Sequence, residues 1–113
     1  MVGVIDGKGS SLTCCKESMT ELVANTVDAS MEKHLPAVTV SGDSINVQIG
    51  SAPHPMENEH NIKFVYVETK RGGQRKALNV GENPTAVFNV AGDEPVAAYA
   101  YCNLHGLWKT DIK

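Results

Sequence analysis

The chain has 113 residues, of which 42% are hydrophobic, and it carries a formal net charge of −3 at pH 7. One domain with a substantial core fits this length, and the slight negative charge, without a long basic stripe, argues against nucleic acid as a partner. A run of about 18 apolar residues does not occur, so the sequence predicts neither a membrane span nor a membrane partner.

The N-terminal part of the chain gives weak structural signals. Residues 1–10 contain three glycines and no apolar run, so we expect them to be loosely attached and not to form a secretory signal. Residues 12–31 fit either one strand and a turn or a short helix near residues 18–24. The odd number of cysteines, with Cys14 and Cys15 adjacent, argues against a disulfide framework. Reduced thiols indicate a cytoplasmic protein.

Strand signals become clear after Pro36. Residues 37–40 form a short β-branched run, and residues 45–49 alternate apolar and polar side chains, which is typical of a half-buried strand. The intervening Ser-Gly-Asp-Ser has the composition of a tight turn. These features predict a hairpin.

The second half of the chain continues the strand pattern. Residues 62–69 carry apolar side chains on both faces and are therefore expected at the centre of a sheet. A turn at residues 71–74 and a return strand at residues 75–80 are predicted to follow. Further strands are predicted at residues 85–90, 96–102 and 107–112. About seven short strands with Gly, Pro and Asp turns between them predict an all-β sandwich.

The sequence Cys102-Asn103-Leu104-His105 places a thiol and an imidazole three residues apart, at the predicted end of a strand. A tight turn would let both side chains meet one metal ion. Taken alone, this spacing is a weak signal. The alternative is a buried cysteine next to an unrelated histidine in a loop.

His54 and His60 flank an acidic segment. Fully extended, they would lie about 20 Å apart, so both can reach one ion only if the segment bends. Pro53 and Pro55 favour such irregular backbone. The alternative is an exposed polar loop, because residues 57–59 are acidic or amide side chains.

His34 precedes Leu35-Pro36, and the residue before a proline is biased toward extended backbone, which suits a projecting loop. An ordinary surface histidine is the alternative for this residue alone. Together, however, three separate segments offer metal ligands at loops or strand ends. Four imidazoles in a plane with a thiolate on the axis leave one open position, which suits a redox-active iron that binds a small oxygen species. The candidate ligands are His34, His54, His60, His105 and Cys102.

Three motifs, in this order, resemble those of superoxide reductases, the neelaredoxin and desulfoferrodoxin family. They are EKHLP at residues 32–36, HPMENEH at residues 54–60 and CNLHGLW at residues 102–108. The resemblance extends from about residue 12 to the C-terminus. It implies an immunoglobulin-like seven-stranded β-sandwich or barrel with one mononuclear non-heme iron, held by four equatorial histidines and one axial cysteine.

The resemblance also implies roles for single residues. Glu32 would be a sixth ligand to the resting ferric iron, and Lys33 would attract superoxide and assist its protonation. The implied activity is one-electron reduction of superoxide to hydrogen peroxide, a detoxification. A rubredoxin-type protein would return the iron to the ferrous state, and a homodimer or homotetramer is expected.

The N-terminal segment departs from the two-iron members of the family, which hold a second iron with four cysteines in a desulforedoxin-like domain. Only Cys14 and Cys15 match the end of that domain, so residues 1–31 are interpreted as a remnant extension and residues 32–113 as the iron-binding domain. One chain cannot supply a four-cysteine site. A second iron is therefore not expected, although two chains could pool four thiols.

Two other functions are alternatives to this one. A cupredoxin-like electron-transfer protein would use two histidines, one cysteine and a weak axial methionine after the last histidine. No methionine follows His105, and Met56 could serve only from another loop. A non-catalytic immunoglobulin-like binding module would need no such ligands. Three basic residues could add to the attraction of superoxide, but a solvated hairpin is the favoured interpretation for Arg71, Arg75 and Lys76.

Overall fold

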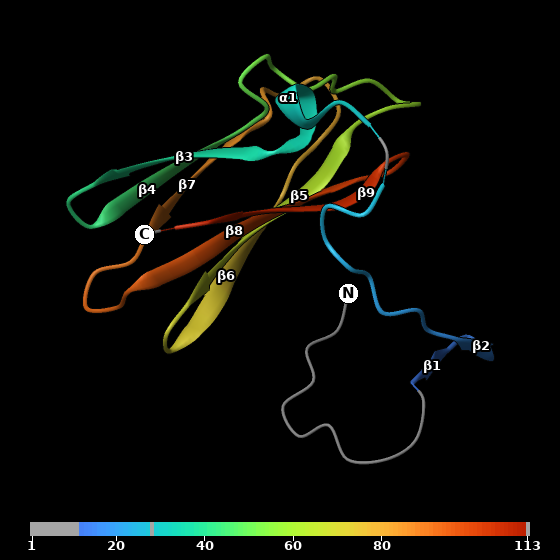
Figure 1. The fold of residues 1–113 in the computed structure, drawn as a ribbon, viewed down its shortest axis with the longest axis horizontal. Helices are drawn as coiled ribbons and strands as arrows, with labels where there is room; N and C mark the ends of the chain where they lie inside the picture. The colour runs from blue at the N-terminus through green and yellow to red at the C-terminus, as the bar shows by residue number, and fades with distance from the viewer. Residues whose placement is uncertain (1–11, 28, 113) are drawn as a thin grey trace.

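The computed structural model describes residues 12–27 and 29–112. The expectation for residues 1–10 lies outside the described residues. In the described part, strands make up nearly all of the regular structure, and one four-residue helix accompanies them. The all-β prediction is confirmed (Figure 1).

Seven strands form a sandwich of two antiparallel sheets (Figure 1). The smaller sheet has the order β3-β4-β7, with β3 at Pro36–Ser41, β4 at Ser44–Ile49 and β7 at Thr85–Asn89. The larger sheet has the order β6-β5-β8-β9, with β6 at Gly72–Ala77, β5 at Ile62–Thr69, β8 at Pro95–Cys102 and β9 at Gly106–Asp111. The predicted number of strands and the inner position of β5 are both confirmed.

The sandwich is immunoglobulin-like only in a loose sense. In a constant-type immunoglobulin domain the fourth strand of the sandwich joins the sheet of the first two. Here the fourth strand, β6, pairs with β5 and so belongs to the larger sheet. A two-residue connection, Lys70–Arg71, explains this placement, because so short a turn keeps consecutive strands adjacent.

The core lies between the two sheets and follows the alternation read from the sequence. Ile45, Val47 and Ile49 of β4 all point inward and are almost completely buried. They pack with Phe88 from β7 and with apolar residues of β5 and β8. Each such side chain contributes on the order of 1.5–3 kcal/mol by leaving water. This packing fixes the strand ends, which carry the candidate ligands.

The turn predicted at residues 71–74 is wrong in position. Thr69 pairs with Gly72, so the turn is Lys70–Arg71, and both glycines already belong to β6. The reason is packing: a Cβ atom on Gly73 would lie 2.0 Å from the Tyr66 hydroxyl. Gly73 therefore makes room for an aromatic side chain on the neighbouring strand, and β6 ends at Ala77.

The N-terminal segment forms a separate hairpin, β1 (Thr13–Cys14) and β2 (Glu17–Ser18) (Figure 1). The strand-and-turn alternative for this region is confirmed, and the short helix near residues 18–24 is not formed. Cys15 and Lys16 have φ of 53° and 66°, which closes the chain in two residues. The one helix, α1 (Met31–His34), was not predicted.

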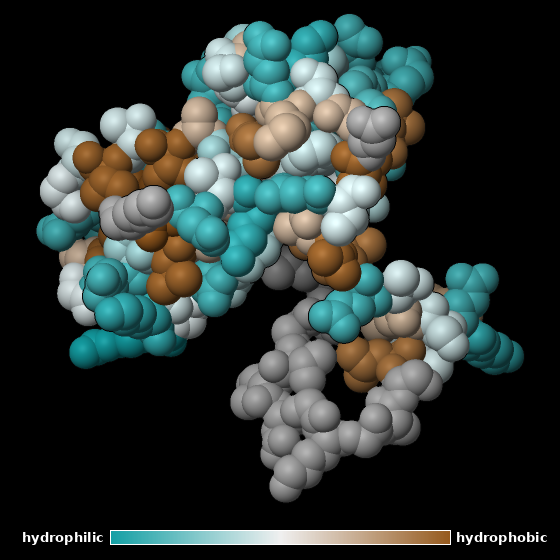
Figure 2. All heavy atoms as spheres, in the orientation of Figure 1, coloured by the Kyte–Doolittle hydropathy of each residue, from teal (hydrophilic) through white to brown (hydrophobic). Residues whose placement is uncertain are grey.

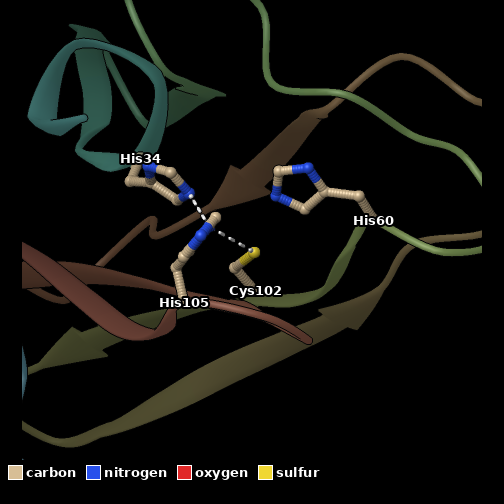
Figure 3. Close-up of side chains that lie close together, drawn as sticks. All are labelled: His34, His60, Cys102 and His105. Carbon is tan, nitrogen blue, oxygen red and sulfur yellow. Dashed lines mark hydrogen bonds between the residues drawn. The ribbon is translucent and has the colours of Figure 1, made fainter. Parts of the chain in front are cut away.

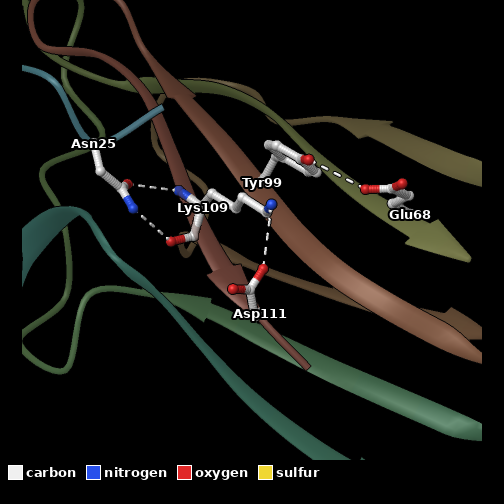
Figure 4. Close-up of polar contacts among 5 residues, drawn as sticks. All are labelled: Asn25, Glu68, Tyr99, Lys109 and Asp111. Carbon is white, nitrogen blue, oxygen red and sulfur yellow. Dashed lines mark hydrogen bonds and ion pairs between the residues drawn. The ribbon is translucent and has the colours of Figure 1, made fainter. Parts of the chain in front are cut away.

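Asn25 attaches the N-terminal segment to the edge of the larger sheet (Figure 4). Its side-chain Nδ2 donates to the Lys109 carbonyl at 3.1 Å, and its Oδ1 accepts from the Lys109 amide at 2.9 Å. Its own amide donates to the Leu107 carbonyl at 3.0 Å. These bonds cover part of the open edge of β9, which would otherwise present unpaired backbone groups.

The surface of the sandwich mixes apolar and hydrophilic side chains on the face seen in Figure 2. Val40 and Val87, for example, are about half exposed. Among the described residues, no helix has the length and apolar character needed to cross a membrane.

Candidate metal centre

The four histidines and Cys102 come from three segments of the chain that meet at one end of the sandwich. Figure 3 shows His34, His60, Cys102 and His105. His34 ends α1, and His54 and His60 lie in the long β4–β5 connection. Cys102 is the last residue of β8, and His105 lies in the turn that leads to β9. These segments are remote in sequence, so packing of the two sheets brings them together.

The helix α1 is held against the end of β4. The Gly50 amide donates to the Leu35 carbonyl at 3.0 Å, and the Ser51 amide donates to the Glu32 carbonyl at 2.8 Å. Gly50 has φ of +85°, and a Cβ atom there would lie 2.6 Å from the Lys33 carbonyl oxygen. Only glycine allows this approach. Gly50 therefore helps to place His34, a role that the sequence analysis missed.

Backbone carbonyls determine which nitrogens of two histidines face the site. His34 Nδ1 lies 2.6 Å from the Ser30 carbonyl, and His54 Nδ1 lies 2.7 Å from the Pro55 carbonyl. A carbonyl can only accept, so each Nδ1 carries the proton and donates it. Each Nε2 then carries a lone pair and no proton, as metal-ligating histidines commonly do.

His105 presents its other nitrogen. Its Nδ1 lies 3.0 Å from His34 Nε2 and 3.9 Å from Cys102 Sγ (Figure 3). Because His105 follows Cys102 by three residues, the short turn directs the near side of the imidazole toward the sulfur. The cluster therefore presents the Nδ1 atom of His105 beside the Nε2 atom of His34.

The four imidazole rings form a closed cycle. Neighbouring centroids lie 4.7 Å apart for His34 and His54, 4.5 Å for His54 and His60, 5.1 Å for His60 and His105, and 4.8 Å for His105 and His34. The diagonal pair His34 and His60 lies 6.2 Å apart. Each neighbouring pair is close to perpendicular, with interplanar angles from 72° to 87°. Four imidazoles that surround a common centre in this way could all contribute a nitrogen to one ion.

Among the described residues, one group of ligand atoms lies within 4.8 Å of one another, and it comprises His34, His60, Cys102 and His105. His54 stands outside this group, although its ring is the neighbour of two others in the cycle. Cys102 is fully buried. Glu32 and Lys33 are exposed on α1 and also stand outside the group.

Burial favours the neutral form of three of the imidazoles, those of His34, His54 and His60. Desolvation lowers the pKa of His54 from 6.5 to about 4, and it also lowers the pKa values of His34 and His60. The positive charge that a neighbouring histidine would carry adds to the lowering in each case. Neutral imidazole is the form that binds metal, so these shifts reduce competition from protons.

Two buried nitrogens indicate that the residues fit a metal ion. His54 Nε2 and His60 Nε2 are inaccessible to solvent and have no hydrogen-bond partner. A buried polar atom without a partner costs about 1–3 kcal/mol, and coordination would remove that cost. Four imidazoles with one thiolate favour iron or copper over a closed structural zinc site.

Some residues that hold the ligands in place were not assigned a role from the sequence. Trp108 stacks on His34, and Asn103 binds the backbone on both sides of His60. Both belong to the CNLHGLW motif. The motif contains more residues than its two candidate ligands, and this is the sequence signal that could have pointed to Trp108 and Asn103.

Comparison with known proteins gives a consistent result. A family model described as Desulfoferrodoxin matches residues 26–111. The desulfoferrodoxin of Clostridium acetobutylicum is 42% identical over 109 residues, which cover 96% of this chain and 86% of that protein. The crystal structure of the superoxide reductase from Treponema pallidum has a TM-score of 0.88 at 41% identity, covering 96% of this chain and 91% of that one. The one-iron superoxide reductase from Giardia intestinalis has a TM-score of 0.60 at 29% identity, covering 73% of this chain and 98% of that one.

Proposed function

This chain belongs to the desulfoferrodoxin family, and we propose that it holds its iron through one set of five side chains. The proposed ligands are His34, His54, His60, His105 and Cys102. The observation that carries this proposal is the cycle of four imidazoles beside a buried thiol, with two buried Nε2 atoms left without partners. One mononuclear non-heme iron per chain fits these donors.

The activity is that of a superoxide reductase, an oxidoreductase that acts on superoxide. Ferrous iron, when bound, supplies the one electron that converts superoxide and two protons to hydrogen peroxide, and it is left ferric. No oxygen is released, which distinguishes the reaction from dismutation. His60 and His105 are only partly buried, so the cluster lies near the protein surface, and superoxide is proposed to enter from that side.

Cys102 is proposed to supply the sulfur ligand, and its full burial beside the imidazoles supports this role. A buried thiolate is shielded from solvent and from oxidation by passing reagents. With iron bound, the Cys102 thiolate would donate electron density to the metal and so favour reduction of superoxide. Imidazoles bind a metal in their neutral form, so the thiolate would carry the only ligand charge in the proposed five-ligand set.

Lys33 and Glu32 are proposed to act at the open position. Both are exposed on α1, directly before the ligand His34. The Lys33 ammonium would attract superoxide locally on a protein whose net charge is −3, and it would assist protonation. The Glu32 carboxylate would bind the resting ferric iron after peroxide has left.

The three basic residues of the β5–β6 hairpin are not part of this proposal. Arg71 lies in the turn after Thr69, at the opposite end of β5 from Ile62, which pairs with Cys102. Arg75 lies over the Phe64 ring, and the Lys76 ammonium donates to the Val87 carbonyl of the other sheet. These contacts favour the interpretation of a solvated hairpin.

The cupredoxin-like alternative is not favoured. It would use two imidazoles, whereas four converge here. Met56, its only candidate for an axial sulfur, packs against the core, and its Sδ accepts a hydrogen bond from the Ile62 amide at 3.4 Å. A non-catalytic binding module would gain nothing from buried nitrogens without partners.

The proposal also covers the domain division, the number of irons, the electron donor, the assembly and the location. Residues 1–31 would be an extension and residues 32–113 the iron-binding domain, whose length matches the 73% of this chain that the Giardia intestinalis enzyme covers. No second iron is expected, because Cys14 and Cys15 are the only cysteines besides Cys102. A rubredoxin-type electron donor, a homodimer or homotetramer, and a cytoplasmic location are proposed. The three free thiols support the last of these.

Iron content, a visible spectrum and a superoxide assay test the proposed function. Purified protein should contain about one iron per chain, show a thiolate-to-iron absorption band when oxidised, and consume superoxide without releasing oxygen. Cys102→Ser should abolish the band, while Cys14→Ser, at an exposed thiol, should leave it unchanged. A band that survives Cys102→Ser would remove Cys102 from the ligand set. An intense blue copper spectrum would support the cupredoxin-like alternative.

A further inference from the structure

Asn103 lies where the larger sheet ends and the turn to His105 begins. The last pair of the antiparallel β5–β8 ladder is Ile62 with Cys102. The next step would pair Asn61 with Asn103, and the Asn103 amide does donate to the Asn61 carbonyl at 3.1 Å. The backbone of Asn103 then turns away toward His105, so it cannot complete the ladder.

The side chain of Asn103 completes the ladder instead. Its Oδ1 accepts from the Asn61 amide at 2.9 Å, and its Nδ2 donates to the Glu59 carbonyl at 2.9 Å. A carboxamide has the same donor and acceptor as a peptide group. It therefore replaces the peptide group that a continuing strand would have supplied. The two residues that it binds flank the candidate ligand His60 on both sides.

We propose that Asn103 is a positioning residue that sets His60 at a fixed distance from Cys102. This inference rests on the proposed function, because it assumes that both residues bind the same iron. The three hydrogen bonds join the loop that carries the sulfur ligand to the loop that carries the imidazole. The chain can therefore turn sharply enough to deliver His105 while His60 stays in register with the sheet.

The side chain of Asn61 extends this arrangement into the β4–β5 connection. It is buried, and its Nδ2 donates to the Glu57 carbonyl at 2.7 Å and to the Asn58 carbonyl at 3.3 Å. These bonds curl the segment before His60, which would otherwise extend away from His54. Asn103 thus holds a loop that is already closed on itself, and displacing it would move His60 as a unit.

The chemistry of the contact selects asparagine. Asn103→Asp keeps an oxygen for the Asn61 amide but replaces the donor to Glu59 with a second acceptor. Asn103→Ala removes both side-chain bonds. Asn25→Ala is a matched control. The Asn25 carboxamide also donates one hydrogen bond to backbone and accepts another, in this case both with Lys109, which is not a candidate ligand (Figure 4).

Two measurements on the full chain test the proposal. In metal-free protein, hydrogen exchange of the Asn61 amide should be slow in wild type and in Asn103→Asp, and fast in Asn103→Ala. In anaerobic titration with Fe²⁺ against a competing chelator, Asn103→Ala should raise the Kd about 10- to 100-fold, and Asn103→Asp should raise it by less. Asn25→Ala should leave the Kd unchanged. The thiolate-to-iron band of both Asn103 variants should shift or broaden.

The outcomes separate this proposal from the proposed function. A wild-type chain that binds no Fe²⁺ would overturn the proposed function. If wild type binds Fe²⁺ tightly and both Asn103 variants have the same Kd as wild type, the positioning role is overturned. A Kd in Asn25→Ala that weakens as much as in Asn103→Ala would also overturn it, since general destabilisation would then explain both. Asn103→Asp retains the bond to Asn61, so its Kd and band decide the matter even if Asn103→Ala does not fold.

Discussion

The indole ring of Trp108 stacks on the imidazole of His34, with centroids 4.9 Å apart and an interplanar angle of 25°. The same indole donates from Nε1 to the His105 carbonyl at 3.1 Å. Trp108 is fully buried. One side chain from β9 therefore contacts two candidate ligands that are 71 residues apart in the sequence.

Replacing Trp108 separates these two contacts. Trp108→Phe keeps a ring against His34 but leaves the His105 carbonyl without its donor, so unfolding free energy should fall by about 1–3 kcal/mol. Trp108→Ala should lower it by about 3–5 kcal/mol and also weaken iron binding. Denaturant unfolding and iron content measure the two effects. Phe88→Ala, in the other sheet, is the control: it should destabilise similarly, and a comparable loss of iron affinity there would contradict a specific role for Trp108.

The stability of the metal-free protein should fall as pH decreases below 6.5. His34, His54 and His60 have lowered pKa values in the folded state, so the unfolded chain binds more protons once pH falls below the ordinary value of 6.5. Above pH 6.5 these histidines do not lower the free energy of unfolding. Below it, the free energy of unfolding decreases progressively toward pH 4. His54 alone, with its pKa lowered to about 4, should cost about 2 kcal/mol between pH 7 and pH 5.

Urea unfolding of metal-free protein at several pH values between 7.5 and 5 measures this dependence. His54→Gln removes the titrating group, so its stability should depend less steeply on pH than that of wild type. An equally steep dependence in the variant would show that other groups cause it.

Lys33 and Glu32 should affect different steps. Lys33→Ala should slow the bimolecular reaction with superoxide and flatten its dependence on ionic strength, because the local attracting charge is removed. Glu32→Ala should leave that step nearly intact and alter the spectrum of the resting ferric enzyme, where water or hydroxide would replace the carboxylate. Pulse radiolysis measures the rate of the reaction with superoxide, and absorption spectroscopy measures the change in the ferric enzyme. An unchanged rate in Lys33→Ala, or a large decrease in Glu32→Ala, would mean that the roles are assigned wrongly.

The two adjacent cysteines of the N-terminal hairpin should not be needed for the iron centre. Cys14 and Cys15 are exposed, and their Sγ atoms lie 3.5 Å apart at the hairpin turn. Substituting both with serine should leave iron content and superoxide reduction nearly unchanged. Metal analysis and sedimentation of the same preparation check this. A clear loss of iron, together with dissociation into smaller species, would indicate a site pooled between two chains.

Much of the fold follows from local patterns in the sequence. The alternation at residues 45–49 reappears as the buried Ile45, Val47 and Ile49, because side chains in a strand point to opposite faces in turn. The turn before β6 was misplaced because Gly72 and Gly73 have the composition of a turn. Contact with Tyr66, which no local pattern reveals, requires a glycine at position 73 within the strand.

The chemical identity of the site was available from the sequence, since side-chain type decides what can bind a metal. Four histidines and Cys102, in three recognisable motifs, were enough to predict an iron centre and its ligands. What the sequence could not supply is their arrangement, because Gly50, Trp108 and Asn103 act through contacts with residues distant in the chain. Only the packing of two sheets brings those segments to one end of the sandwich, closes four imidazoles into a cycle, and lowers the pKa values of His34, His54 and His60 by burial.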